Sequence, residues 1–262
     1  MKGNSNPMFR KAWLVAMIAA VLVMNRSRAA DDVATNLVTA HPDGGMFMIC
    51  PAVGFDRNEY SSPDPLTGQN VAHKNTAGEY ALMASYVDSR VAVNNILFYT
   101  NPNDSKVWGD IFALSVNGDP KEVVTWAAGG SYTWHEIEMP GMSLRINEPL
   151  VRVGPLFRVP SCNLALNPYV GYARLMLNTT YGNDAWNTSV LGAIARWDWR
   201  MVHVFGQYYL QDNPELDQVY QVFRARQIVF VTEHWGLMAR EEYMRQYTSK
   251  DTSLLFGVVY LF

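Results

Sequence analysis

The final segment of the chain alternates strictly between two kinds of side chain. From 252 to 262 an apolar residue fills every second position: Leu254, Phe256, Val258, Tyr260 and Phe262. Successive side chains of a β-strand point to opposite faces, so these residues form one continuous apolar face. A chain that ends on such a strand is expected to build that strand into a larger β-structure.

The end of this segment resembles the C-terminal assembly signal of bacterial outer-membrane β-barrels. Phe262 is the terminal aromatic residue, Tyr260 is a second aromatic residue and Gly257 precedes both, although Leu255 stands where the signal usually has a polar residue. The resemblance implies insertion into the outer membrane by the barrel-insertion machinery. A buried terminal strand of a soluble periplasmic β-sandwich is the alternative interpretation.

The N-terminal segment has the pattern of a secretory signal peptide. Arg10 and Lys11 precede an apolar run over 12–24, and Ser27-Arg28-Ala29 has small residues at the positions that a signal peptidase reads. The run is shorter than the ~20 residues of a membrane-spanning helix, although an uncleaved anchor is the alternative. We therefore expect a signal peptide over 1–29, a periplasmic segment over 30–45 and a transmembrane barrel over 46–262.

Composition is compatible with either a membrane barrel or a soluble β protein. The chain has 14 Tyr, 11 Phe and 8 Trp, whereas charged residues make up only 17%. No segment after the signal peptide is a long uninterrupted apolar run, so a mature chain that spans a membrane must do so as a barrel. The net charge of −3 argues against a nucleic-acid partner.

From residue 46 onward the chain divides into strand-like segments separated by turn residues. Their number is even, as in bacterial single-chain barrels, and most approach the ~9–11 residues that cross a bilayer at a tilt. The predicted strands are 46–56, 78–88, 90–100, 107–117, 122–134, 142–158, 163–178, 187–197, 199–211, 218–231, 234–247 and 252–262.

The predicted connections alternate between short and long. Asp198 alone forms one of the short turns, and 57–77 is the longest of the loops. Outer-membrane barrels have short periplasmic turns and longer outer loops. The alternation therefore predicts a closed antiparallel barrel of about twelve strands with both ends of the chain on the periplasmic side.

Alternation within the strands predicts which side chains face lipid. Val124, Trp126, Tyr208 and Leu210 lie on apolar faces, and tryptophans near strand ends fit an interfacial girdle. The predicted girdle is Trp126, Trp134, Trp197, Trp199 and Trp235.

Charged residues within the strands are expected to face inward, because an Arg or Lys facing lipid at the bilayer midplane costs ~2–4 kcal/mol. The predicted lining of the lumen is Glu148, Arg152, Arg158, Arg196, His203, Arg224, Arg226, Arg240 and Glu242.

Several residues fit this alternation badly. Pro149, Pro155 and Pro168 lie inside predicted strands, and Arg174 and Glu241 lie on faces that are otherwise apolar. Bulges that swap the two faces are the expected explanation.

No catalytic or cofactor-binding pattern is apparent, and no metal or cofactor is expected. His203 lies in a strand without an acid among the residues that share its face, and Glu136 and Glu138 beside His135 are assigned to a loop. Whether Cys50 and Cys162 pair stays open.

The pattern favours a narrow porin-like channel for small solutes, with an anion preference if the arginines are in excess. A non-conducting barrel that binds a partner through its outer loops, chiefly 57–77, is the second hypothesis, and a lipid-modifying barrel enzyme is the third. Expected partners are outer-membrane lipid and lipopolysaccharide, the insertion machinery and small solutes. The pattern does not determine the oligomeric state.

Overall fold

A computed structural model describes residues 45–262 apart from 64–69, 89, 102–105, 140–141, 180–181, 216–217 and 246–248. The predicted signal peptide over 1–29 and the periplasmic segment, except its last residue, lie outside the described residues.

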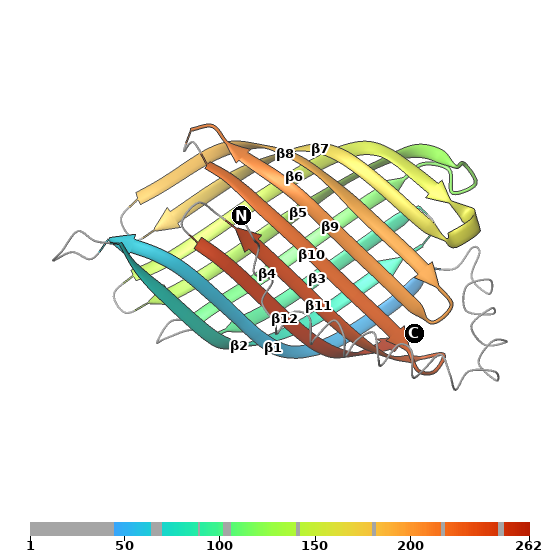
Figure 1. Cartoon of the computed structure of the whole chain (residues 1–262), viewed down its shortest axis with the longest axis horizontal. Helices are drawn as coiled ribbons and strands as arrows, with labels where there is room; N and C mark the ends of the chain where they lie inside the picture. The colour runs from blue at the N-terminus through green and yellow to red at the C-terminus, as the bar shows by residue number, and fades with distance from the viewer. Residues whose placement is uncertain are drawn as a thin grey trace, which may run out of the picture.

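The described residues form twelve β-strands and one short 3₁₀ helix (Figure 1). The strands are β1 (Met46–Pro63), β2 (Asn70–Val87), β3 (Val91–Thr100), β4 (Lys106–Asn117), β5 (Val124–Met139), β6 (Met142–Val159), β7 (Leu164–Thr179), β8 (Gly182–Trp199), β9 (Val202–Asn213), β10 (Gln218–Phe230), β11 (Trp235–Arg245) and β12 (Ser249–Leu261). The 3₁₀ helix η1 (Pro160–Cys162) joins β6 to β7.

Each strand pairs with its neighbours in the sequence, and β12 returns to pair with β1. Every pairing is antiparallel, so the sheet closes into a barrel whose strands tilt strongly (Figure 1). At the seam the Phe262 backbone N–H donates to the Phe47 carbonyl oxygen at 3.0 Å, and the two rings lie 5.5 Å apart. The predicted closed barrel of twelve antiparallel strands is confirmed.

Tight turns gather at the end of the barrel where β1 begins and β12 ends (Figure 1). In the β2–β3 turn the Asp88 carboxylate accepts hydrogen bonds from the backbone N–H groups of Arg90 and Val91, each at 2.6 Å. These donors lower the pKa of Asp88 below its ordinary value. The β8–β9 turn holds Arg200 at a φ of 50°, so this turn follows Trp199 and is not the predicted single residue Asp198.

Several strands are longer than the sequence predicts. Residues 57–63 and 70–77, expected in an outer loop, extend β1 and β2, and β5 continues through the expected loop to Met139. The apolar alternation that marks a strand ends where the strand leaves the lipid layer, whereas its backbone pairing continues beyond that point. The loop prediction therefore missed the polar outer ends of these strands.

The predicted bulges are absent from the described pairings. Pro149 lies opposite Tyr132 and Pro168 lies opposite Ala193 in registers that continue unchanged on both sides. Arg174 and Glu241 consequently stay on the same outward faces as their apolar neighbours. The bulge prediction was wrong because the pairs on both sides of each exception keep one register, although the β6–β7 ladder has no pairs at 148–149 and 154–156.

Among the described residues, no helix is long and apolar enough to cross a membrane.

Gly54 lies at the seam, where β1 approaches β12 closely. A Cβ atom built there would lie 1.8 Å from the Leu254 carbonyl oxygen, and backbone atoms cannot move aside as a flexible side chain does. We expect Gly54→Val to prevent closure, so that the protein loses a compact form that resists unfolding until heated in a gel-shift assay. Gly206→Val is the matched control, since no atom lies within 4 Å of a Cβ there. A normal heat shift in Gly54→Val would contradict this.

Candidate functional site

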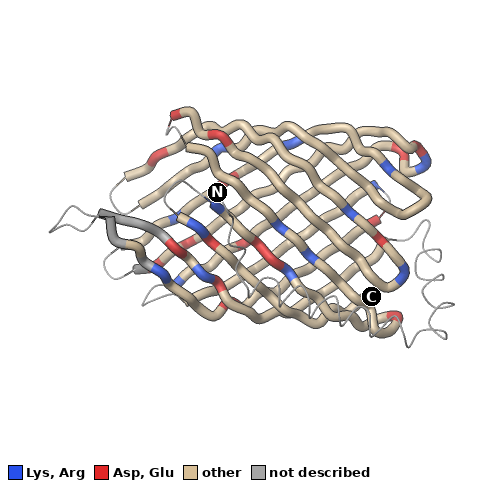
Figure 2. Tube along the Cα trace, viewed as in Figure 1, with Lys and Arg blue, Asp and Glu red and all other residues tan. Residues whose placement is uncertain are grey.

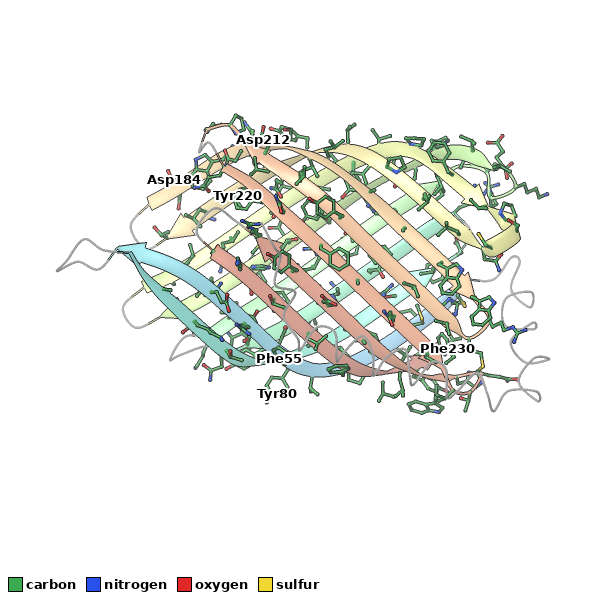
Figure 3. All side chains as sticks on the ribbon, viewed as in Figure 1. Phe55, Tyr80, Asp184, Asp212, Tyr220 and Phe230 are labelled. Atoms are coloured by element: carbon green, nitrogen blue, oxygen red, sulfur yellow. The ribbon has the colours of Figure 1, made fainter. Side chains whose placement is uncertain are left out.

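The lumen is the candidate site, and exposure separates its side chains from those on the outer surface. In β9, Tyr209 and Gln211 are 7% and 6% exposed, whereas Tyr208, next to Tyr209 in the chain, is 45% exposed. The same contrast holds in β2, where Glu79 is buried and Tyr80 points away from the barrel (Figure 3). Alternation thus divides each strand into a lumen face and a lipid face.

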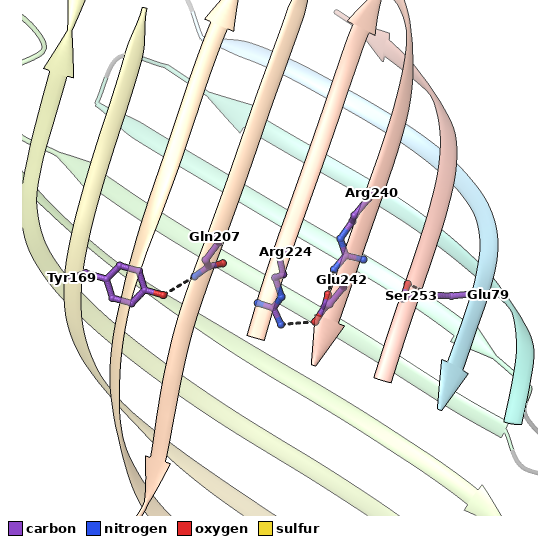
Figure 4. Close-up of polar contacts among 7 residues, drawn as sticks. All are labelled: Glu79, Tyr169, Gln207, Arg224, Arg240, Glu242 and Ser253. Carbon is purple, nitrogen blue, oxygen red and sulfur yellow. Dashed lines mark hydrogen bonds and ion pairs between the residues drawn. The ribbon is translucent and has the colours of Figure 1, made fainter. Parts of the chain in front are cut away.

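An arginine-rich ion-pair network crosses β10 and β11. Arg224 Nη2 lies 2.9 Å from Glu242 Oε1, and Arg240 contacts the other oxygen of the same carboxylate (Figure 4). Arg224 stands directly opposite Glu242 in the ladder, whereas Arg226 stands opposite Arg240. Because Arg226 and Arg240 carry like charges in register, they repel each other. The contact of Glu242 with Arg240 offsets part of that repulsion.

Three of the lumen arginines lie over aromatic rings. The guanidinium of Arg152 is 5.2 Å from the Tyr169 ring centroid, and that of Arg226 is 5.8 Å from the Phe205 centroid. Arg224 lies 5.8 Å from the Tyr209 ring. Among the described residues neither Arg152 nor Arg226 forms an ion pair with a carboxylate. These two guanidinium groups therefore keep positive charge that no fixed acid neutralises.

Of these aromatic residues, Tyr169 belongs to a polar network that fixes its position. Gln207 donates to the Tyr169 hydroxyl at 2.9 Å (Figure 4). On the same strand as Gln207, Gln211 donates to Glu148 at 2.5 Å and to Thr188 at 3.0 Å. Glu148 is thereby held by an amide and not by an arginine.

A group of acids lines the lumen on the β12–β1–β2 side. Ser253 donates to Glu79 (Figure 4). Nearby, the side chains of Asp56 and Asp251 hydrogen-bond to each other. No ion pair joins these three acids to an arginine among the described residues. The lumen is therefore uneven in charge around its circumference, with arginines concentrated on β6, β8, β10 and β11.

The lumen half near the tight turns is apolar on the side of β10, β11, β12, β1 and β2. The buried members of this apolar cluster are Met48, Cys50, Ala52, Ala81, Met83, Ile228, Phe230, Met238, Leu255, Val259 and Leu261. A small cavity beside Arg226 is lined by Met48, Met83 and Met238 from this cluster. The close packing of these side chains narrows the lumen between the arginines and the tight turns.

The remaining predicted lumen residues lie at the end of the barrel where the tight turns gather. Asp198 contacts His203 Nδ1 and Arg196 Nε, both at 2.7 Å. Arg158 Nη1 donates to the carbonyl oxygens of Asp119 and Glu122, each at 2.9 Å. Arg158 thus braces a turn, while Asp198 holds His203 and Arg196 together.

The predicted outer-surface residues lie on lipid faces. Trp126 and Trp235 are 53% and 50% exposed, and the rings of Trp197 and Trp199 stack 5.9 Å apart. The Arg145 guanidinium lies over the Trp134 ring, 5.9 Å from the centroid of that ring. Val124 and Tyr208 are likewise exposed, and Val202, Val204 and Leu210 share the face of Tyr208.

The predicted assembly-signal residues lie at the end of β12. The Tyr260 and Phe262 rings meet edge to face at 4.8 Å. Gly257 leaves room for Cys50, because a Cβ there would lie 2.6 Å from Cys50 Sγ. Both cysteines are free, Cys50 buried in the lumen and Cys162 exposed in η1. No group of three or more His, Cys, Asp or Glu side chains in the described ranges is arranged to hold a metal ion.

The sequence missed several lumen residues. His135, assigned to a loop, lies in β5 with its ring edge-on to Phe98. Asp198, assigned to a turn, is the acid that partners His203 from the neighbouring strand. Tyr169 and Tyr209, for which the sequence indicates no role, both face the lumen. Only strand pairing brings these groups together, so a search along single strands could not find them.

Comparison with known proteins identifies a fold and no family. No protein-family model matches the chain, and no curated protein matches it. The translocator domain of the autotransporter NalP from Neisseria meningitidis matches with a TM-score of 0.52 at 15% identity, covering 95% of this chain and 98% of that domain. This chain has the fold of an outer-membrane β-barrel.

Two further solved barrels match more weakly. The β domain of the Bordetella autotransporter BrkA has a TM-score of 0.49 at 12% identity and covers 84% of this chain and 100% of its own. The KdgM porin has a TM-score of 0.43 at 10% identity, with 80% of this chain and 99% of the porin covered.

Glu242 is expected to stabilise the barrel by holding two arginines. Removing one partner of a buried pair typically costs 3–5 kcal/mol, and the partial exposure of Arg224 and Glu242 to the lumen reduces this to about 1–3 kcal/mol. We therefore expect Glu242→Gln to lower the temperature of the gel shift. Glu241→Gln, which removes the adjacent charge from the outward face, is the control and should not lower that temperature. Equal behaviour of the two variants would show that the network contributes nothing.

Proposed function

We propose that this protein is a bacterial outer-membrane channel for small solutes, with a mild preference for anions. The observation that carries the proposal is the positive charge of Arg152 and Arg226 in the lumen, since neither forms an ion pair with a carboxylate among the described residues. Charged groups that line a pore attract ions of opposite sign and repel those of like sign at close range. Small anions are the solutes that such a lining favours.

The dimensions of the lumen support selection for small solutes. A barrel of twelve strands is wider than the eight-stranded barrels that side chains fill, and narrower than the 16–18-stranded general porins. Tyr209, Tyr169 and the apolar cluster occupy much of this interior. We infer a narrow path that passes the arginines and skirts the apolar wall.

The proposed orientation places the tight turns and Phe262 on the periplasmic side of the membrane. The opposite ends of the long strands β1 and β2 then lie on the outer side. Short turns at one end and extended strands at the other support this orientation. The same proposal includes export of the chain by the N-terminal signal peptide and its insertion into the membrane by the barrel-insertion machinery.

A non-conducting barrel that binds a partner is the second candidate function. The close-packed apolar cluster favours it, because such packing narrows the lumen on one side. Under either candidate we propose no enzymatic activity. Asp198 hydrogen-bonds to His203 and also pairs with Arg196, and this arrangement fits bracing of the rim.

Conductance in planar bilayers tests the channel. Replacing Arg224 and Arg226 together by Gln should lower the anion-to-cation permeability ratio roughly fivefold, since a unit charge at ~4 Å in water contributes about 1 kcal/mol. Insertion should be unchanged, because Arg240 still pairs with Glu242.

The matched control removes two arginines from the outward face, as Arg145→Gln with Arg174→Gln, and should leave selectivity unchanged. If both double variants conduct with the same selectivity, the lumen arginines do not determine that selectivity. A folded wild-type protein without conductance would refute the channel and favour the second candidate.

A further inference from the structure

A second concentration of charge lies outside the lumen, at the outer ends of β11, β12, β1 and β2. Strand pairing joins Arg245 to Lys250, Lys250 to Glu59, and Glu59 to Lys74 in one row that crosses the seam. Arg57 lies beside this row on β1. We call Arg57, Lys74, Arg245 and Lys250 the basic patch; Figure 2 shows charged positions gathered on these strands, at the end away from the C-terminus.

The basic patch faces away from the lumen. On β1 it continues the outward face of Val53, which is 58% exposed, and on β2 that of Tyr80, which is 59% exposed. On β12 it continues the face of Phe256, which is 50% exposed. Because the registers are unbroken, the alternation that turns these residues outward also turns the patch outward.

Positive charge in the patch exceeds negative charge. Glu59 forms an ion pair with Arg57 and lies within electrostatic range of Lys74 and Lys250. Lys74, Arg245 and Lys250 form no ion pair of their own among the described residues. One carboxylate therefore stands among four cations.

Two cations elsewhere on the outer rim have acids of their own. Arg145 pairs with Glu136 at 3.3 Å, and Lys106 lies opposite Glu138 in the β4–β5 ladder. The excess at the patch is therefore a local feature and not a property of the whole rim.

An apolar wall adjoins the patch on the side of the membrane. Val53, Tyr80 and Phe256 cover it with exposed apolar side chains. The patch is separated from the tight turns by roughly 10 residues of strand, about the length that crosses a bilayer. Under the proposed orientation it lies at the level of the outer headgroups.

We infer that the basic patch binds a lipid of the outer leaflet whose headgroup carries more than one phosphate, as lipopolysaccharide does. Arg245, Lys250 and Lys74 lie on strands that together span roughly 14 Å at ~4.8 Å per strand, which exceeds the reach of one phosphate. Separate phosphates contact separate cations, and the acyl chains lie on the apolar wall. This inference rests on the proposed membrane placement and is independent of conduction.

Binding of lipopolysaccharide to the full-length protein in non-ionic detergent tests the inference. The triple variant Lys74→Gln, Arg245→Gln, Lys250→Gln should bind it at least tenfold more weakly, because each basic residue near an anionic headgroup contributes severalfold. Chemically dephosphorylated lipid should bind wild type as weakly as it binds the variant. Inorganic phosphate at millimolar concentration should not displace the lipid.

The matched control, Lys106→Gln with Arg145→Gln and Arg174→Gln, removes the same charge elsewhere on the rim and should bind within twofold of wild type. A variant with Lys74→Arg and Lys250→Arg keeps the charge and should also bind normally. Equal loss in control and patch variants, or full displacement by inorganic phosphate, would overturn the inference.

Two readouts separate this inference from the channel. A patch variant that keeps its heat shift and conductance while losing lipid establishes the site. A wild-type protein that does not conduct, yet shows the expected lipid pattern, leaves the site in place and refutes only the channel.

Discussion

Closure of the hydrogen-bond ladder between β1 and β12 is the constraint on which the structure depends. Inside a lipid layer no water satisfies backbone N–H and C=O groups, so an open edge of a sheet is too costly to persist. The seam removes that edge, and Gly54 and Phe262 lie directly on it. Closure at the seam also requires that the staggers of all the strand pairs add up to one fixed total around the ring.

Closure fixes the charges of the interior. Once the ladder is continuous, each strand presents alternate residues to a confined space where arginines, aromatic rings and acids must coexist. Glu242 holds Arg224 and Arg240, whereas Arg152 and Arg226 lie against rings without a carboxylate. The same packing that braces the barrel leaves the positive charge on which the proposed anion preference depends.

The outer surface shows the same alternation of side chains along each strand, with different residue types. The outward alternation that exposes Val53 and Phe256 to lipid continues into the basic patch, where the strands leave the apolar layer. Glu241 and Arg174 show that the alternation tolerates charge on the lipid face without a bulge. Regular pairing therefore outweighs the preference of single residues, as an unbroken ladder satisfies many groups at once.

The strand-like segments and the alternating lengths of their connections predicted the strand number and the closed fold, and the alternation of side chains predicted the faces on which Tyr208, Arg224 and Phe256 lie. This alternation did not determine where polar strands such as β1 and β2 end, because a strand beyond the lipid carries no apolar signal. Only the tertiary structure decided that Arg224 meets Glu242, that Arg226 meets Arg240, and that Asp198 meets His203. Lys74, Glu59 and Lys250 form one row only because the first strand pairs with the last, and partners across strands depend on a register that no single strand contains.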